Sequence, residues 1–196
     1  MLALFDFDGT LTSRETFGAL VAFAVPRRRL MFGRLLLWPL VVGYRLRLLP
    51  GTLVRACVVW FGFRGLFVDS VCDAGQDFAG TVLPTLMRPE AVARLRQHLG
   101  QGDTVAVVSA AFDVYLAPWC AAQGVDLLCS RLQSAGGRLT GRYAGEQCVG
   151  EEKARQVRAR YELDRFAEVH AYGDTGKDLA LLALAHKKFY RGRQRG

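Results

Sequence analysis

Acidic residues are absent from a long early segment of this chain. No Asp or Glu lies between Thr16 and Val68, although the whole chain of 196 residues contains 18. The same segment holds eight arginines: Arg27, Arg28, Arg29, Arg34, Arg45, Arg47, Arg55 and Arg64. The rest of the chain balances 18 basic against 18 acidic residues, so this segment carries the whole net charge of +8. Its arginines stand among Leu, Trp and Val, a setting that suits lipid headgroups better than a nucleic-acid backbone. We therefore expect no nucleic-acid partner.

Several other features are missing. The five cysteines are scattered, odd in number and form no C-x-x-C pair, which argues against a disulfide framework or a zinc site. No basic residues precede the first apolar run, and that run meets Asp6 too early for a signal peptide. Within 30–49 the longest uncharged run is Leu35–Tyr44, about 15 Å of helix and half of a bilayer core. These absences predict a cytoplasmic protein without an ordinary transmembrane span. They leave open a peripheral location on the inner face of the cell membrane.

The pattern of predicted elements changes at Arg88. After a strand over 2–8, the earlier part is helical, with helices over 13–25, 30–49, 53–63 and 68–79. The capping-box pattern Thr12-x-x-Glu15 predicts the start of the first of these helices. In the later part we expect helix 90–99, strand 104–108, helix 112–123 with Gly124 as its C-cap, strand 125–129, hairpin 132–143, helix 150–161, strand 168–172, helix 179–185 and a short basic tail. Such alternation predicts an α/β fold, a parallel sheet with helices on both faces.

The helices predicted over 30–49 and 53–63 are apolar on nearly every side, so each must be buried in protein or in lipid. One interpretation is that they pack on each other and on the main domain. The other is that they form a membrane-surface face, since anionic lipids attract basic segments that bear aromatic residues. The sequence leaves both open.

Two carboxylates follow the first strand. On a strand, residues i and i+2 point to the same side, so Asp6 and Asp8 should share one face at its carboxyl end, where open α/β sheets bind ligands. Two such charges are costly unless a cation neutralises them or one keeps its proton. The pair suggests a divalent metal, with one carboxylate attacking and the other handling a proton. The alternative is ordinary Asp-Gly turn chemistry.

Further polar residues end strands or open helices on the same side of the predicted sheet. They are Ser109, Lys153, and Asp174 with Asp178. Together with Asp6 they supply what phosphoryl transfer needs: a nucleophile, hydrogen-bond donors, a cation and metal-binding carboxylates. A phosphate loop around Lys177 is excluded, because Ala171 and Asp178 occupy positions where that motif requires Gly and Ser or Thr.

The stretches DFDGT, VVSAA, the lysine of GEEKARQV and YGDTGKD resemble, in order and spacing, the four motifs of the haloacid dehalogenase superfamily of phosphatases. The insertion between the first two motifs is similar to the helical cap of the subfamily that contains phosphoserine phosphatase. The resemblance implies a Rossmann-like catalytic core over 1–12 and 85–196 and a helical cap over 13–84.

The resemblance also implies roles for individual residues. Asp6 would be the nucleophile that becomes an aspartyl phosphate, and Asp8 the acid and base whose backbone carbonyl also binds Mg²⁺. Asp174 would coordinate Mg²⁺, with Asp178 close behind it.

The phosphate oxygens would be held by other groups. Ser109 and the Ala110 amide would donate to them, and Lys153 would neutralise both the phosphate and Asp6. Outside the resemblance, a lysine in a Glu-Glu-Lys run is usually solvated.

The substrate depends on the cap. Glu15 and Arg55 resemble the residues with which phosphoserine phosphatases hold the substrate's amino and carboxylate groups. Glu15 is equally explained by the capping box, and Lys177 replaces the asparagine usual in those enzymes. The apolar, arginine-bearing cap is more similar to that of bacterial phosphatidylglycerophosphatase C enzymes, which act on a phospholipid precursor. We therefore favour a membrane lipid phosphate as substrate. Phosphoserine or another small phosphomonoester is the alternative, and a basic nucleic-acid- or membrane-binding protein without catalysis is the alternative of another class.

Overall fold

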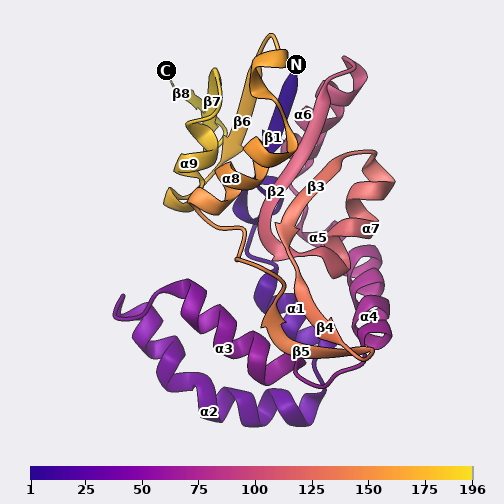
Figure 1. The fold of residues 1–196 in the computed structure, drawn as a ribbon, viewed down its shortest axis with the longest axis vertical. Helices are drawn as coiled ribbons and strands as arrows, with labels where there is room; N and C mark the ends of the chain where they lie inside the picture. Colours follow the sequence, from indigo (N-terminus) through magenta and orange to yellow (C-terminus); the bar gives the residue numbers. More distant parts are fainter. Residues whose placement is uncertain (196) are drawn as a thin grey trace.

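The computed structural model describes residues 1–195, which form an α/β body and a helical part joined at a narrow waist (Figure 1). The body is built on a six-stranded sheet of order β3-β2-β1-β6-β7-β8. Its strands are β1 (Leu2–Phe5), β2 (Thr104–Phe112), β3 (Asp126–Ser130), β6 (Val169–Gly173), β7 (Lys187–Tyr190) and β8 (Arg193–Arg195). Only β8 runs antiparallel to its neighbour among these strands. The predicted fold class is confirmed.

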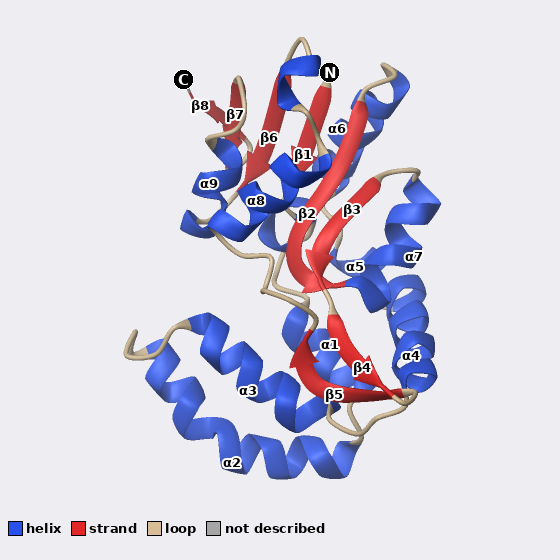
Figure 2. Ribbon diagram, viewed as in Figure 1, coloured by secondary structure: helices blue, strands red, loops and turns tan. Residues whose placement is uncertain are grey.

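Helices cover both faces of this sheet because side chains alternate along its central strands (Figure 2). Ala3 and Phe5 face the helices α6 (Pro89–Gly100) and α7 (Asp113–Gln123). Leu2 and Leu4 face α8 (Glu151–Arg160) and the short α9 (Leu179–Leu182). Helix α7 ends as predicted at Gly124, which has φ of 70°.

The helical part contains α1 (Phe17–Ala24), α2 (Arg27–Arg45), α3 (Gly51–Phe63), α4 (Val68–Thr81) and α5 (Leu83–Leu86). The hairpin of β4 (Leu132–Ala135) and β5 (Arg138–Tyr143) lies beside α3, although it comes from the later half of the chain (Figure 1). The backbone N–H of Gly65 donates to the Leu139 carbonyl (2.7 Å), and the Leu139 N–H donates to the Leu66 carbonyl (2.9 Å). Part of the cover of α3 therefore comes from residues well outside 13–84.

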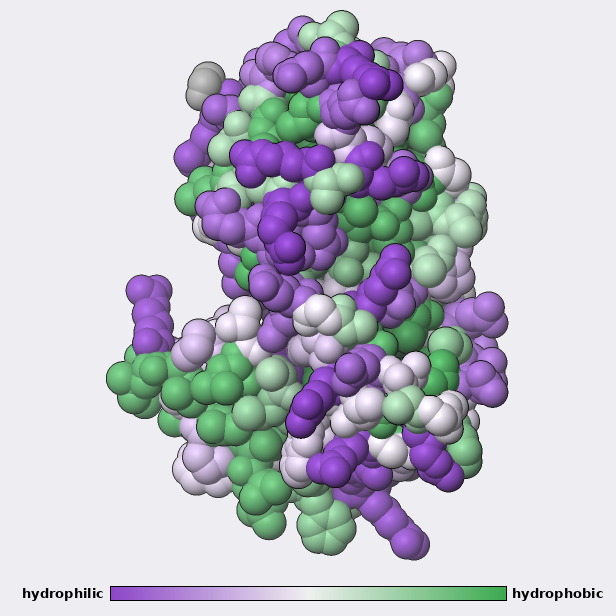
Figure 3. Space-filling model, in the orientation of Figure 1, coloured by the Kyte–Doolittle hydropathy of each residue, from purple (hydrophilic) through white to green (hydrophobic). Residues whose placement is uncertain are grey.

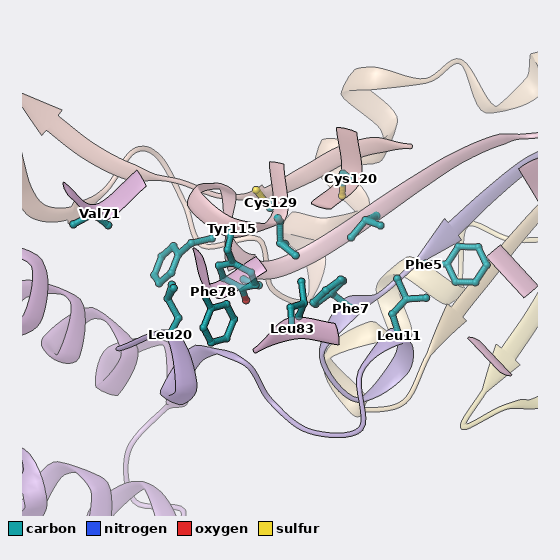
Figure 4. Close-up of a cluster of buried hydrophobic side chains, with 14 of the residues drawn as sticks. Phe5, Phe7, Leu11, Leu20, Val71, Phe78, Leu83, Tyr115, Cys120 and Cys129 are labelled. Atoms are coloured by element: carbon teal, nitrogen blue, oxygen red, sulfur yellow. The ribbon is translucent and has the colours of Figure 1, made fainter. Parts of the chain in front are cut away.

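One hydrophobic cluster runs from the sheet into the helical part. It includes Phe5, Phe7, Tyr115, Phe78 and Leu20, each 0 or 1% exposed (Figure 4). Phe78 of α4 packs edge-on against Tyr115 of α7, with ring centroids 5.2 Å apart. The two parts of the molecule are therefore held together by a shared core at the waist.

Helix α2 buries only a narrow stripe against α3. Gly33 fits closely there, since a Cβ at this position would lie 2.9 Å from the Phe61 ring. Most of its remaining surface is apolar and exposed, as the green area at the lower left of Figure 3 shows. Exposed side chains include Met31 (70%), Leu35 (74%) and Trp38 (57%). The interpretation that the apolar helices are buried by packing on each other and on the main domain is therefore wrong for most of the surface of α2. No helix within 1–195 is long and apolar enough to cross a membrane.

Several predicted elements differ from the structure. The helix predicted over 30–49 spans Arg27–Arg45, the strand predicted over 104–108 runs to Phe112, and the helix predicted over 179–185 ends at Leu182. The first strand ends at Phe5 rather than residue 8, because the chain turns tightly over Phe7–Leu11. The first helix begins at Phe17 rather than 13, because the Thr12 hydroxyl donates to the backbone carbonyls of Phe7 (3.2 Å) and Arg14 (2.8 Å) instead of capping a helix. The predicted basic tail is largely the pair of strands β7 and β8.

Candidate active site

The loop after β1 places Asp6 and Asp8 at the carboxyl edge of the sheet. The Asp6 N–H donates to the Tyr172 carbonyl of β6 (2.9 Å), which fixes the point where the loop leaves the sheet. Gly9 then turns the chain with φ of 85°, and a Cβ there would lie 2.3 Å from Asp174 Oδ2. Glycine adopts this φ without strain and leaves room for the Asp174 carboxylate.

The two carboxylates line one small cavity of about 30 Å³ but engage different partners. Asp6 faces Lys153, whereas Asp8 Oδ1 accepts hydrogen bonds from the Thr16 N–H (2.9 Å) and hydroxyl (2.6 Å). The prediction that Asp6 and Asp8 face one cavity is therefore confirmed. The alternation of side chains along a strand, from which it was argued, is not the cause. Both residues lie beyond the strand, in the turn.

Lys153, on the first turn of α8, is 3% exposed and lies between two carboxylates. Its ammonium group donates to Asp6 and, at 2.6 Å, to Asp178 Oδ1. Burial alone would lower the pKa of this lysine, but the two carboxylates raise it above its ordinary value. Lys153 is therefore a permanent buried cation and not the solvated lysine that its sequence context suggests.

Asp6 itself is 5% exposed. Burial raises its pKa to about 7, and the positive charge of Lys153 opposes that rise. Any further cation beside Asp6 would favour the ionised form, which is the form able to act as a nucleophile.

Asp178 is held by donors on both of its oxygens. Burial would raise its pKa, but Lys153 and the Thr175 N–H and hydroxyl lower it below the ordinary value. Its Oδ2 accepts from the N–H groups of Asp174 (3.2 Å) and Thr175 (3.0 Å). Asp178 therefore fixes both Lys153 and the loop that carries Asp174.

Asp6, Asp174 and Asp178 each offer an oxygen within 4.8 Å of the other two. Asp174 Oδ1 is buried and has no hydrogen-bond partner among residues 1–195, and burial raises the pKa of this carboxyl. An unpartnered buried oxygen beside two further carboxylates is a donor set suited to a hard divalent cation such as Mg²⁺. The residues present fit the predicted metal.

Thr16 and Tyr115 hold Asp8 in place. The Thr16 hydroxyl, which donates to Asp8, also shares a hydrogen bond with the buried Tyr115 hydroxyl. Burial raises the pKa of Asp8, and the two Thr16 donors oppose this. The result is an oriented carboxyl that favours retention of a proton. Sequence reasoning missed both partners, since Tyr115 is 99 positions from Thr16.

The phosphate-binding residues predicted from the second motif lie at the same cavity. Ser109 is 1% exposed, and its hydroxyl oxygen accepts from the Ala111 N–H (3.1 Å), which leaves its own O–H available to a ligand. Ala110 also lines the cavity.

Glu15 and Arg55 reach the cavity from the helical part. Arg55 donates to the Ala110 carbonyl (3.2 Å), and its guanidinium lies 4.4 Å from the centre of the Phe17 ring. Glu15 is exposed, with its carboxylate 3.8 Å from the Lys177 ammonium. Because α1 begins only at Phe17, the capping-box explanation of Glu15 is wrong.

Comparison with known proteins identifies the family. The model of the haloacid dehalogenase-like hydrolases matches residues 3–183. The chain belongs to this family. It is therefore a hydrolase, as its motifs predicted.

The protein CicA of Caulobacter vibrioides is a relative of this haloacid dehalogenase-like hydrolase and is 37% identical to it over 194 residues. The match covers 97% of this chain and 86% of CicA. A protein with unknown function from Bordetella pertussis Tohama I has a similar structure, with a TM-score of 0.80 and 25% identity, covering 95% of this chain and 87% of the other. A phospho-aspartyl intermediate analogue of phosphoserine phosphatase has a TM-score of 0.67 at 22% identity, covering 95% and 84%. This last likeness shows the fold alone.

Proposed function

We propose that this hydrolase is a phosphomonoesterase that works through an aspartyl phosphate on Asp6. The observation that supports this most strongly is the buried arrangement of Asp6, Lys153 and Asp178 beside an Asp8 carboxyl that is held separately by Thr16. It provides a nucleophile with its counter-charge and, within the same cavity, a group that can carry a proton.

In the first half of the reaction, an Asp6 oxygen attacks the phosphorus of the ester. The bond from phosphorus to the leaving oxygen breaks as Asp8 gives that oxygen a proton. In the second half, Asp8 takes a proton from water, and the water oxygen attacks the phosphorus of the aspartyl phosphate. Inorganic phosphate leaves, and the Asp6 carboxylate is restored. The raised pKa of Asp8 favours the protonated form with which this cycle begins.

The remaining residues bind and orient the phosphoryl group. Ser109 and the Ala110 amide donate to its oxygens, and Lys153 balances their charge. Asp6, Asp174 and the Asp8 backbone carbonyl would hold Mg²⁺, with Asp178 behind them. When bound, Mg²⁺ supplies positive charge to the transferring phosphoryl group.

We further propose a lipid phosphate at an anionic membrane surface as the substrate. The exposed apolar side of α2, in a segment that has eight arginines and no acid, supports this choice. A surface of this kind is costly in water and has no use with a small soluble ester. Phosphoserine is the second candidate, because Glu15 and Arg55 both line the catalytic cavity.

A phosphatase screen with Mg²⁺ tests both levels of the proposal. The substrates are phosphatidylglycerophosphate, lysophosphatidate, phosphoserine and para-nitrophenyl phosphate. We expect wild type to hydrolyse the lipid phosphates best and Asp6→Asn to lose nearly all turnover. Asp8→Asn should lose about 100- to 10,000-fold. The matched control is Asp164→Asn on the exposed surface, which should retain wild-type rates. Near-normal activity of Asp6→Asn would refute the mechanism, and a preference for phosphoserine would refute only the lipid substrate.

A further inference from the structure

The helical part contains an apolar groove that is separate from the catalytic cavity. It has a volume of about 450 Å³ and runs between α2, α3 and β5. Its lining includes Leu36 and Leu40 of α2, Ala56, Cys57 and Trp60 of α3, and Tyr143 of β5. Arg142 is the one charged residue that lines it within the described chain. The groove falls within the size range of small-ligand sites and has the lining of a site for an apolar ligand.

The groove depends on a close approach of β5 to α3. Gly141 has φ of 79°, and a Cβ there would lie 3.0 Å from the Trp60 Cα and 2.8 Å from the Arg64 Cβ. With glycine at this point, the strand forms one wall of the groove and α2 forms the other. The groove is therefore a consequence of backbone geometry and not a gap left by poor packing.

Residues that line the groove are neighbours of residues that line the catalytic cavity. Ala56 and Cys57 directly follow Arg55, which lines that cavity. The Tyr143 ring packs against Phe112, with centroids 5.6 Å apart, and Phe112 in turn packs against Phe17 beneath the Arg55 guanidinium. The rings of Tyr143, Phe112 and Phe17, with Arg55, therefore connect the lining of the groove to the lining of the cavity.

Two polar atoms at this junction have no partner. The Tyr143 hydroxyl and Arg55 Nε are both buried, and no atom of residues 1–195 forms a hydrogen bond with either. Burial raises the pKa of Tyr143, and the neighbouring Arg55 guanidinium opposes this rise. The phenol keeps its proton and can donate. Buried donors without acceptors are costly, and a ligand that brings oxygen atoms to this point would satisfy them.

We propose that the groove binds one acyl chain of a lipid phosphate, and that Tyr143 and Arg55 donate to oxygens of the group joining chain and phosphate. This inference rests on the proposed function, because it takes the phosphate end to be in the catalytic cavity. The positive charge of Arg55 and the absence of acids in 16–68 favour an anionic lipid. The groove would then position the headgroup, while the exposed side of α2 contacts the membrane.

The first test measures binding and not turnover. Straight-chain alkylphosphonates of one to ten carbons, kept below their micellar concentrations, are titrated into the wild-type protein by calorimetry. Each methylene that enters the groove should strengthen binding about fourfold. Ala56→Trp should abolish this dependence on chain length. The matched control, Val58→Trp, lies in a different groove on the other side of α3 and should retain it.

A second measurement locates the chain. In a Cys72→Ser background, which removes the exposed cysteine, decylphosphonate should slow the reaction of Cys57 with N-ethylmaleimide, and methylphosphonate should not. A Kd independent of chain length together with unchanged Cys57 labelling would overturn the groove while leaving the phosphatase intact. Loss of the chain-length dependence in Val58→Trp alone would place the chain in the other groove and would also overturn it. Failure to hydrolyse para-nitrophenyl phosphate would instead refute the proposed function.

Discussion

The proposed membrane contact can be tested through two arginines at the start of α2. Arg27 and Arg28 are exposed, and their side chains form no hydrogen bond or ion pair with any residue of 1–195. Arg29 differs, because its guanidinium donates to the carbonyls of Gly62 (3.0 Å) and Arg64 (2.8 Å) and so holds the end of α3. The informative variant is therefore Arg27→Gln with Arg28→Gln, which removes two charges and leaves Arg29 in place.

The expected magnitude follows from the charge removed. Each arginine near an anionic surface contributes about 1 kcal/mol at low salt, so losing two should weaken vesicle binding by roughly 30-fold. Raising the salt from 0.1 M to 1 M shortens the screening length from about 10 Å to about 3 Å and should reduce the difference between the variant and wild type. Trp38→Ser should weaken binding at every salt concentration, since burial of an exposed indole is not screened.

Co-sedimentation with vesicles of anionic and of neutral lipid measures the effect. The matched control is Arg96→Gln with Arg158→Gln, which removes two exposed charges from α6 and α8 of the α/β body. If that control weakens binding as much as the α2 variant does, the attraction is a property of net charge and not of α2. If wild type ignores anionic vesicles, the membrane proposal is wrong.

Three further predictions concern the metal, the packing and the pH dependence of stability. Asp174→Ala should raise the Mg²⁺ concentration needed for half-maximal activity, and EDTA should abolish wild-type activity until Mg²⁺ is restored; activity that survives chelation would contradict the site. Gly75→Ala should lower the free energy of unfolding by about 1–3 kcal/mol, because its Cβ would lie 2.2 Å from a carbonyl oxygen of α7. Gly80→Ala, on the same helix, meets open space and should raise the free energy of unfolding by up to about 1 kcal/mol. Urea unfolding measures both. Asp103 accepts a hydrogen bond from His98, and the interactions of this carboxylate hold its pKa below the ordinary value despite burial. Asp103→Asn should therefore be less stable than wild type near pH 7, and the difference should shrink as the pH falls below about 4, where the wild-type carboxylate takes up a proton; a constant difference in thermal unfolding across this range would contradict that account.

Much of the α/β body could be predicted because the sequence patterns that specify its elements are local. Buried parallel strands are continuous apolar runs, and Gly124 marks a helix end through its own backbone preference. Asp6 and Asp174 were predicted together because the carboxyl ends of neighbouring strands meet at one edge of a sheet.

The features that the sequence failed to predict are those for which the residue pattern is weak or fits two structures equally well. The hydroxyl of Thr12 fits a helix cap as well as it fits the loop that it actually closes, so the capping-box pattern could not distinguish them. The strand β7 begins with two lysines and lies near the sheet edge, where charged residues are tolerated and the apolar signal is weak. The exposure of α2 could not be predicted either, because a helix that is apolar on nearly every side has the same sequence pattern whether protein or lipid covers it.

The hairpin of β4 and β5 has a consequence for how the chain is made. It covers α3, yet it follows that helix by about 75 residues. At about 5–20 residues per second, a ribosome needs on the order of 4–15 seconds to add that length. Throughout this interval, the side of α3 that β5 later covers has no partner from its own chain. A nascent protein interrupted before Arg138 would be released with two apolar helices uncovered, one that the finished fold shields and one that it never does.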